Sequence, residues 1–208
     1  MLELPYYYFL ETSLDGIPVI VTRTGWSAEV GYELYLRDGS RGVELWERVM
    51  EAGQPHHIVP TGPSDIRRLE AGILNYGADM TLENNPYEVG LGWLIDEGKQ
   101  ADYIGKAALQ RIKAAGVKRQ LVGVEIAGEP IAFNMTKWAV TKAGQPIGQV
   151  TSAVYSPRLE KNIGYALLPI EYAALGAQVT VMVEDVEERA AIVVQKPFID
   201  PKKDIPKS

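Results

Sequence analysis

The chain has 208 residues, of which 46% are hydrophobic and 23% charged, a composition typical of a globular protein with one large domain or two small ones. Its formal net charge of −6 argues against nucleic acid or another partner that is bound through phosphates. It has no cysteine, which excludes disulfides, thiolate nucleophiles and cysteine-ligated zinc.

The first part of the chain predicts a small sheet. Residues 6–14 and 17–23 read as two strands joined by a hairpin turn at Asp15-Gly16, because both residues tolerate a positive φ. A third strand is expected at 32–36. The strand period of two places Glu33 and Tyr35 on one face and the neighbouring leucines on the other. We expect the leucines to face the core, and Glu33 and Tyr35 to face water or a pocket.

Helices are expected to follow these strands. Ser40 can begin a helix over 41–52, in which Trp46 lies on the apolar face and is expected in the core. A second helix is predicted from Thr61, with Pro63 in its first turn. A third helix is predicted over 103–115, capped by Asp102. Strands followed by helices in this order indicate an α+β fold, an antiparallel sheet with helices on one side.

A different pattern begins near residue 117. Short strands recur at 121–126, 138–141, 147–155, 163–168, 179–183 and 190–194, separated by turn signals. Such spacing predicts a small all-β barrel or sandwich. We therefore expect an α+β domain at 1–116, an all-β domain at 117–199 and a frayed tail at 200–208.

Metal and membrane sites are not expected. The two histidines, His56 and His57, are adjacent and point in different directions, and no spacing among the carboxylates marks a metal site. No apolar run approaches the ~20 residues of a membrane span. The segment 1–6 lacks the basic region of a signal peptide and reads as a start inside a domain. A cytoplasmic protein is the resulting expectation.

Two segments carry a resemblance to a known family. Residues 23–36 read R-T-G-W-S-A-E-V-G-Y-E-L-Y-L, residues 62–72 read G-P-S-D-I-R-R-L-E-A-G, and Y-G-A-D follows at 76–79. Their order and spacing resemble the tetrahydrofolate-dependent glycine cleavage T-protein, or aminomethyltransferase, family. The resemblance runs from about residue 7 to 198, and G-Q-V-T-S at 148–152 is similar to the family's G-x-V-T-S signature. It implies a C-terminal β-barrel, and the chain looks like the second half of a longer family member.

The resemblance also implies a folate site. Family members bind tetrahydrofolate in a central cavity, where Glu33 aligns with a glutamate that contacts the pterin and Trp26 with an aromatic residue that lines the cavity. A carboxylate suits that role because it can accept two parallel N–H bonds from the pyrimidine edge. Tyr35, Ser64 and Arg68 are the expected substrate contacts. The family's catalytic acid lies in the half that this chain lacks, so no catalytic residue is assigned here.

Two departures from the family pattern bear on the substrate. Ser64 stands where aminomethyltransferases have an arginine, and Trp26 replaces the usual tyrosine. Loss of a fixed positive charge and gain of an indole favour a small cationic donor. Together with the run 82–86, these residues look closest to the dimethylsulfoniopropionate demethylases, which are folate-dependent relatives.

The leading hypothesis is therefore the C-terminal portion of a tetrahydrofolate-dependent methyltransferase that demethylates a small onium donor such as dimethylsulfoniopropionate. One alternative is the glycine cleavage aminomethyltransferase, and another is a non-catalytic folate-binding or interaction fragment. The expected partners are the methyl or aminomethyl donor, the missing N-terminal half and, as a further option, a second copy of the chain. Neither nucleic acid nor membrane is expected as a partner.

Overall fold

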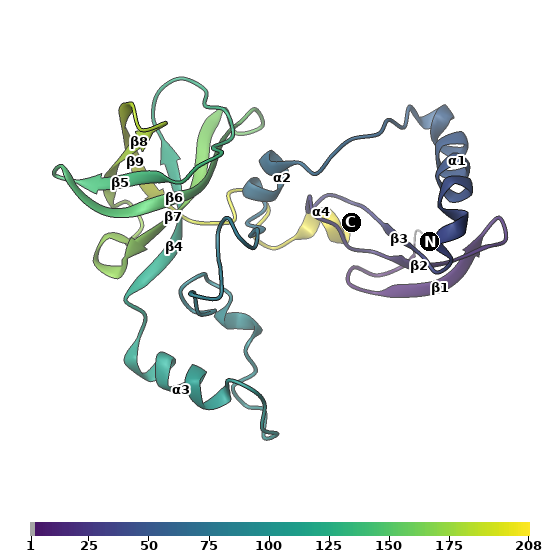
Figure 1. The fold of residues 1–208 in the computed structure, drawn as a ribbon, viewed down its shortest axis with the longest axis horizontal. Helices are drawn as coiled ribbons and strands as arrows, with labels where there is room; N and C mark the ends of the chain where they lie inside the picture. Colours follow the sequence, from purple (N-terminus) through teal and green to yellow (C-terminus); the bar gives the residue numbers. More distant parts are fainter. Residues whose placement is uncertain (1–2) are drawn as a thin grey trace. The chain divides into compact units, whose positions relative to one another are not determined.

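A three-stranded antiparallel sheet and a closed barrel organise the chain in the computed structural model, which describes residues 3–208 (Figure 1). The prediction that residues 1–6 are not a signal peptide includes Met1 and Leu2, which lie outside the described residues. The chain divides into two compact units. Unit 1 runs to Arg67 and also includes Lys202–Ser208, whereas unit 2 is Arg68–Pro201.

The sheet of unit 1 has the strand order β1-β2-β3, with β1 at Phe9–Leu14, β2 at Ile17–Thr22 and β3 at Glu33–Leu36. Asp15 and Gly16 both have positive φ, 47° and 77°, as the hairpin turn between β1 and β2 requires. Helix α1 (Gly42–Gly53) packs against one face of this sheet through Leu45, which lies in the core with the inward residues of β2. Short 3-10 turns flank α1 at Gly39–Arg41 and Gln54–His56.

The third strand has the two faces that its sequence pattern predicts. Leu34 and Leu36 pack against the core of unit 1, as does the preceding Tyr32. Tyr35 points to the opposite face and is 52% exposed, and Glu33 shares that face. The uncovered face of β3 is therefore available for a ligand.

Trp46 is not in the core, contrary to the expectation from its helical position, because it is 55% exposed. Of the residues of α1, only Leu45 is buried. The narrow sheet covers a single stripe of the helix, through Leu45 and Val49, and Trp46 lies about 100° around the helix from Leu45.

The second and third helices are shorter than expected. Helix α2 spans Asp65–Glu70 and ends before Gly72, whose positive φ of 75° favours glycine and where a Cβ would meet Pro197 at 3.1 Å. Asp102 accepts a hydrogen bond from the Tyr103 N–H, but α3 begins only at Lys106 and runs to Ala115. A 3-10 turn at Gly92–Leu94 lies between α2 and α3.

Unit 2 contains the barrel, which settles the choice between barrel and sandwich. Its antiparallel strands close in the order β4-β7-β6-β5-β8-β9, and β9 pairs with β4. The strands are β4 (Arg119–Ile126), β5 (Trp138–Lys142), β6 (Gln145–Ser156), β7 (Lys161–Pro169), β8 (Gln178–Val183) and β9 (Glu187–Val194). Alternating aliphatic residues such as Val124, Val140 and Val181 fill the interior. The 3-10 turn Ile170–Tyr172 follows β7.

The compact units differ from the predicted domains in two places. The barrel begins at Arg119, but residues 68–116, expected with the first domain, belong to the same unit as the barrel. The predicted frayed tail is instead ordered, because Asp204–Lys207 form helix α4 and Pro206 is buried. Helices in the described part of the chain are all too short or too polar to cross a bilayer.

Candidate functional site

Glu33 is held by hydroxyl groups on the uncovered face of the unit 1 sheet. Its Oε2 accepts hydrogen bonds from Thr24 Oγ1 at 2.5 Å, Tyr35 OH at 3.0 Å and Thr22 Oγ1 at 3.3 Å. The strands explain this arrangement. Thr22 lies directly opposite Glu33 in the β2–β3 register, and Tyr35 lies two residues along the same strand, on the same face.

These hydroxyls keep Glu33 ionised. The hydrogen bond from Thr24 is the largest influence and lowers the pKa of Glu33, the bonds from Tyr35 and Thr22 act in the same direction, and partial burial opposes them. The same hydrogen bond to Glu33 raises the pKa of Tyr35, so Tyr35 remains a donor. The site at neutral pH is therefore a carboxylate whose orientation is fixed by neutral donors.

The two oxygens of Glu33 are used differently. Oε2 receives all three hydroxyl groups, whereas Oε1 accepts no hydrogen bond from any residue in the described range 3–208. A ligand N–H group can approach Oε1 without displacing a protein donor. The two-oxygen contact expected from the sequence would require Oε2 to share its lone pairs with the hydroxyls.

Trp26 lies in the loop between β2 and β3, and its side chain is 41% exposed. The loop is braced further along, where Glu29 Oε1 accepts a hydrogen bond from Arg67 Nη1 at 2.5 Å. The exposed indole is therefore presented by a loop that starts beside Thr22 and ends beside Glu33. Such a ring offers a flat apolar surface to a heterocycle or a cation.

Ser64, an expected substrate contact, acts locally at the start of α2. Its Oγ accepts a hydrogen bond from the Arg67 N–H at 3.3 Å, which is the geometry of a helix N-cap. A hydroxyl acceptor satisfies one of the free N–H groups of the first helical turn. The arginine that Ser64 replaces in the resemblance would not provide this bond.

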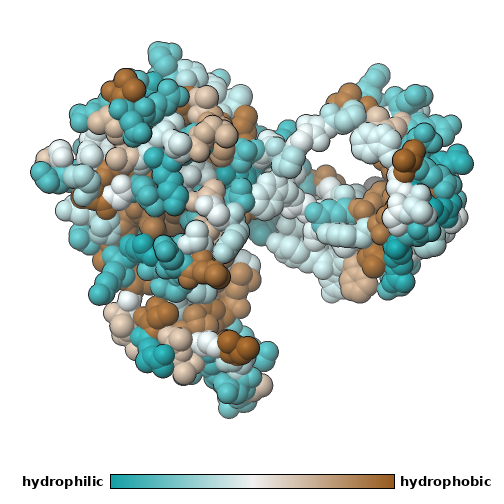
Figure 2. Space-filling model, viewed as in Figure 1, coloured by the Kyte–Doolittle hydropathy of each residue, from teal (hydrophilic) through white to brown (hydrophobic). Residues whose placement is uncertain are grey.

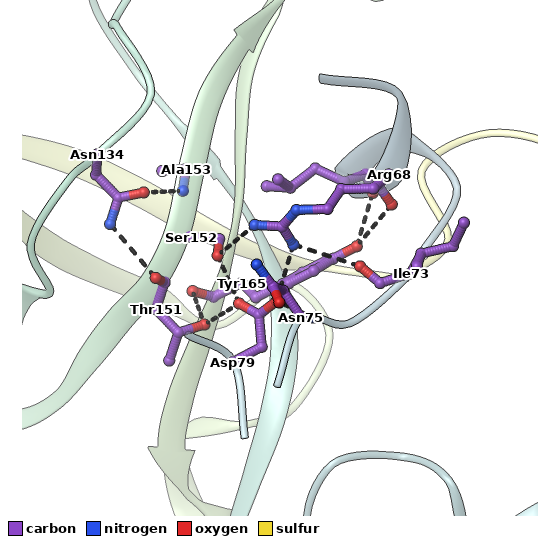
Figure 3. A network of polar contacts seen from close by, with 10 residues as sticks. Arg68, Ile73, Asn75, Asp79, Asn134, Thr151, Ser152, Ala153 and Tyr165 are labelled. Carbon is purple, nitrogen blue, oxygen red and sulfur yellow. Dashed lines mark hydrogen bonds and ion pairs between the residues drawn. The ribbon is translucent and has the colours of Figure 1, made fainter. Parts of the chain in front are cut away.

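Arg68, also expected to contact substrate, has no exposed surface at all. Its Nη1 donates to Asp79 Oδ2 at 2.8 Å and its Nη2 donates to Ser152 Oγ at 2.9 Å (Figure 3). Arg68 therefore belongs to the interior of unit 2, whereas Glu33 and Tyr35 are residues of unit 1. Its role is structural, in place of the substrate contact expected from the sequence.

Asp79 is the centre of this buried network. Its Oδ1 accepts from Thr151 at 2.8 Å and Ser152 at 2.6 Å, and its Oδ2 accepts from Arg68 and from the Asn75 N–H, both at 2.8 Å (Figure 3). A buried ion pair is stable only when its remaining lone pairs are also satisfied, as they are here. The Y-G-A-D and G-Q-V-T-S segments thus serve to join residues 68–79 to the barrel.

Sequence reasoning missed the two threonines of the Glu33 site. Thr22 and Thr24 alternate with Arg23, so the period of two already places them on one face. The register that sets Thr22 opposite Glu33 comes from the pairing of β2 with β3, which the sequence alone does not give.

The barrel carries a separate cavity of about 810 Å³, lined by residues that include Lys142, Tyr155 and Lys161. None of the predicted site residues lines it. Among residues 3–208 there is no group of three or more acidic or histidine side chains that could hold a metal ion.

Comparison with known proteins gives consistent matches along the chain. Residues 2–99 match the family model described as the GCVT N-terminal domain, and residues 119–200 match that of the glycine cleavage T-protein C-terminal barrel domain. A protein of Bacillus cytotoxicus named aminomethyltransferase is 35% identical over 199 residues, which cover 94% of this chain and 53% of that protein. An aminomethyltransferase of Caldanaerobacter subterraneus subsp. tengcongensis is 37% identical over 94% of this chain and 52% of its own length.

A solved structure shows the same fold. The crystal structure of the glycine cleavage system aminomethyltransferase T from Bartonella henselae superposes with a TM-score of 0.82 at 24% identity, over 96% of this chain and 54% of that one. The chain thus spans about half the length of the relatives that it matches.

Proposed function

Because this chain belongs to the glycine cleavage T-protein family, we propose that it is the C-terminal portion of a tetrahydrofolate-dependent one-carbon transferase, with aminomethyl transfer as its reaction. The observation that carries the folate assignment is the state of Glu33, a carboxylate whose Oε2 is fixed by three hydroxyls and whose Oε1 accepts no bond from residues 3–208. The aminomethyl assignment is supported by the names of the curated relatives.

Glu33 fits the edge of a pterin. The 2-amino pyrimidine edge offers N–H donors, and an ionised carboxylate is the acceptor that forms the stronger, charge-assisted bond with them. Oε1 is the free acceptor, and the hydroxyls on Oε2 keep the carboxylate from rotating away. A preoriented acceptor binds its ligand at a lower entropic cost than a mobile one.

Trp26 and Tyr35 are the other two residues that we propose for the folate-binding surface of this chain. Trp26 provides an exposed aromatic face for the ring system, and Tyr35 provides its partly exposed ring because its hydroxyl is already bonded to Glu33. Tetrahydrofolate, when bound, supplies the nitrogen that accepts the one-carbon unit. The residues of this chain hold and orient it, and the catalytic acid implied by the resemblance belongs to the half that the chain lacks.

The missing half is also the proposed partner. The curated relatives are about twice as long as the matched region, so the other half of such a protein is needed to complete the cavity. Small-molecule sites bury most of their ligand between domains, and one exposed wall does not. The aromatic side chains Tyr7, Tyr8 and Phe9 are each more than 60% exposed and would otherwise favour self-association.

Demethylation of an onium compound is the second candidate. The exposed indole of Trp26 can form a cation–π contact with a sulfonium group, worth ~0.5–2 kcal/mol, and Ser64 brings no positive charge. The family relatives are nevertheless named for aminomethyl transfer, and Ser64 has a local capping role that explains a serine without reference to charge.

The experiment is a donor assay on the whole gene product with tetrahydrofolate present. We expect 5,10-methylenetetrahydrofolate to form from an aminomethyl group carried on a lipoyl protein, with release of ammonia and of the dihydrolipoyl protein. Production of 5-methyltetrahydrofolate from dimethylsulfoniopropionate, with no aminomethyl activity, would replace the first candidate with the second. Folate binding without turnover of either donor would support the non-catalytic alternative.

A further inference from the structure

Arg23 is a nearly buried arginine whose acceptors are main-chain oxygens. Its side chain sits at the end of β2 and the residue is 7% exposed. Nη1 donates to the Leu4 carbonyl at 3.1 Å, and Nη2 donates to the carbonyls of Pro206, at 3.3 Å, and Ser208. Nε is buried and has no hydrogen-bond partner among the described residues. A buried guanidinium is costly unless its protons are satisfied, so each of these carbonyls matters.

Two of these carbonyls come from the segment Lys202–Ser208, which belongs to unit 1 although the preceding residues belong to unit 2. The segment forms helix α4 and buries Pro206. It is fastened at a second point, because Lys203 Nζ donates to the Tyr7 hydroxyl at 2.8 Å and lies 5.4 Å from the centre of the Tyr7 ring. Residues more than 180 positions apart in the sequence thus bind one another at two places.

Arg23 also lies next to the Glu33 site. Its neighbours Thr22 and Thr24 are the residues whose hydroxyls reach Glu33. Its guanidinium carbon lies 5.8 Å from the centre of the ring of Tyr32, the residue that precedes Glu33. Arg23 is therefore connected to Glu33 through its two threonine neighbours and through Tyr32.

The main chain of Arg23 is tied to the same region. Its N–H donates to the Tyr8 carbonyl and its carbonyl accepts from the Tyr7 N–H, both at 3.0 Å. Tyr7 is the residue that Lys203 holds. The contacts of residues 202–208 thus lead to Arg23 through its side chain and through its main chain.

We infer that residues 202–208 form an intramolecular latch, and that Arg23 is a positioning residue through which the latch fixes Thr22, Thr24 and Glu33. The inference rests on the proposed function only in treating Glu33 as a ligand contact. Without the latch, Arg23 loses its bonds to Pro206 and Ser208, and the protons left behind must be hydrated. Water entry at Arg23 then loosens the loop that carries Thr24.

Two variants of the 208-residue chain test the latch. One ends after Pro201, and the milder one is Lys203→Ala. Lys202→Ala is the matched control, because Lys202 is exposed and only its main-chain carbonyl, which this substitution keeps, is bonded within the segment. Lys203→Arg keeps a cation beside Tyr7 and is expected to behave as the unchanged chain.

Hydrogen exchange followed by NMR gives the first readout. Loss of the latch should speed exchange of the Tyr7 and Arg23 amides at least about tenfold, with the barrel amides unchanged, because local opening affects only the unit that loses contacts. Equal acceleration in both units would make the segment a general stabiliser and overturn the inference.

The second readout is the carboxyl titration of Glu33, assigned by comparison with Glu33→Gln. When Thr24 moves away, the pKa of Glu33 should rise toward its ordinary value of 4.5. An unchanged titration of Glu33 in the truncated chain would overturn the inference. If the truncated chain does not fold, the same titration in Lys203→Ala is the deciding measurement. Neither readout contains folate, so failure of folate binding would remove the proposed function without affecting this test.

Discussion

Arg68 Nη1 and Asp79 Oδ2 lie 2.8 Å apart, and neither side chain has any exposed surface. Arg68→Met would leave Asp79 buried without its counter-charge, so we expect a loss of ~3–5 kcal/mol in the free energy of unfolding of unit 2. Lys161→Met is the control, because Lys161 forms an exposed pair with Glu125 that is worth less than ~1 kcal/mol. Urea unfolding followed by tryptophan fluorescence, to which the buried Trp138 contributes, measures both. Equal stability of the two variants would contradict the structural role of Arg68.

Thr24→Val removes the hydrogen bond that most lowers the pKa of Glu33. The folded-state pKa is below the unfolded value, so this interaction stabilises the protein above pH ~4.5 and is lost as the pH falls through the folded-state value. Thr24→Val should therefore make the stability of unit 1 less dependent on pH below 4.5. The test measures the stability of unit 1 as the pH is lowered, for Thr24→Val and for the control Thr12→Val. The Thr12 side chain lies on the opposite face of the sheet. An identical acid profile for Thr24→Val and the unchanged chain would mean that Thr24 does not hold Glu33.

Ser64→Arg restores the charge found in aminomethyltransferases according to the resemblance. If the whole protein acts on a cationic onium donor, an added cation should lower its turnover, since like charges repel in a poorly solvated site. Ser64→Ala is the control, because it removes the cap at a cost of ~1 kcal/mol and adds no charge. Unchanged demethylation in Ser64→Arg would remove the argument from charge, whereas higher aminomethyl transfer would favour the first candidate.

The 208-residue chain by itself should bind tetrahydrofolate weakly and turn over no donor. A single open wall leaves the hydrogen bonds to the pterin in competition with water, where they are worth much less. Folate consumption can be followed by liquid chromatography with the purified chain. Adding the separately produced N-terminal half should restore binding. Measurable product from the 208-residue chain alone would place catalytic groups among residues that we describe as structural.

Much of unit 1 could be predicted from local pattern. The period of two in β3 correctly separates Glu33 and Tyr35 from the leucines, and the Asp15-Gly16 turn has the positive φ values that its residue types favour. The six short strands were also recognisable from their turns and alternation. Their pattern left barrel and sandwich open, and the prediction of a barrel came from the family resemblance.

The predictions that were wrong concern features that depend on contacts between residues far apart in the sequence. The helical period sets the position of Arg68 relative to Ser64. The interior position of Arg68 depends on its hydrogen bond to Ser152, which comes 84 positions later. Gly72, just after the end of α2, lies against Pro197, which comes 125 positions later in the sequence. The polar segment 202–208 reads as a frayed tail. Its order is explained by the carbonyls of Pro206 and Ser208, which accept hydrogen bonds from Arg23, and by the bond from Lys203 to Tyr7. No local pattern contains these pairings.

The most direct test of the account is calorimetry of tetrahydrofolate binding to the whole gene product with Glu33→Gln. Replacing an acceptor oxygen by an NH₂ group should cost ~1.5–3 kcal/mol, or roughly tenfold to a hundredfold in affinity. Glu47→Gln is the control, because Glu47 is exposed on α1, which packs on the other face of the sheet, so this variant should bind folate as the unchanged protein does. Equal affinities for Glu33→Gln and the unchanged protein would remove Glu33 from the folate site and contradict the account.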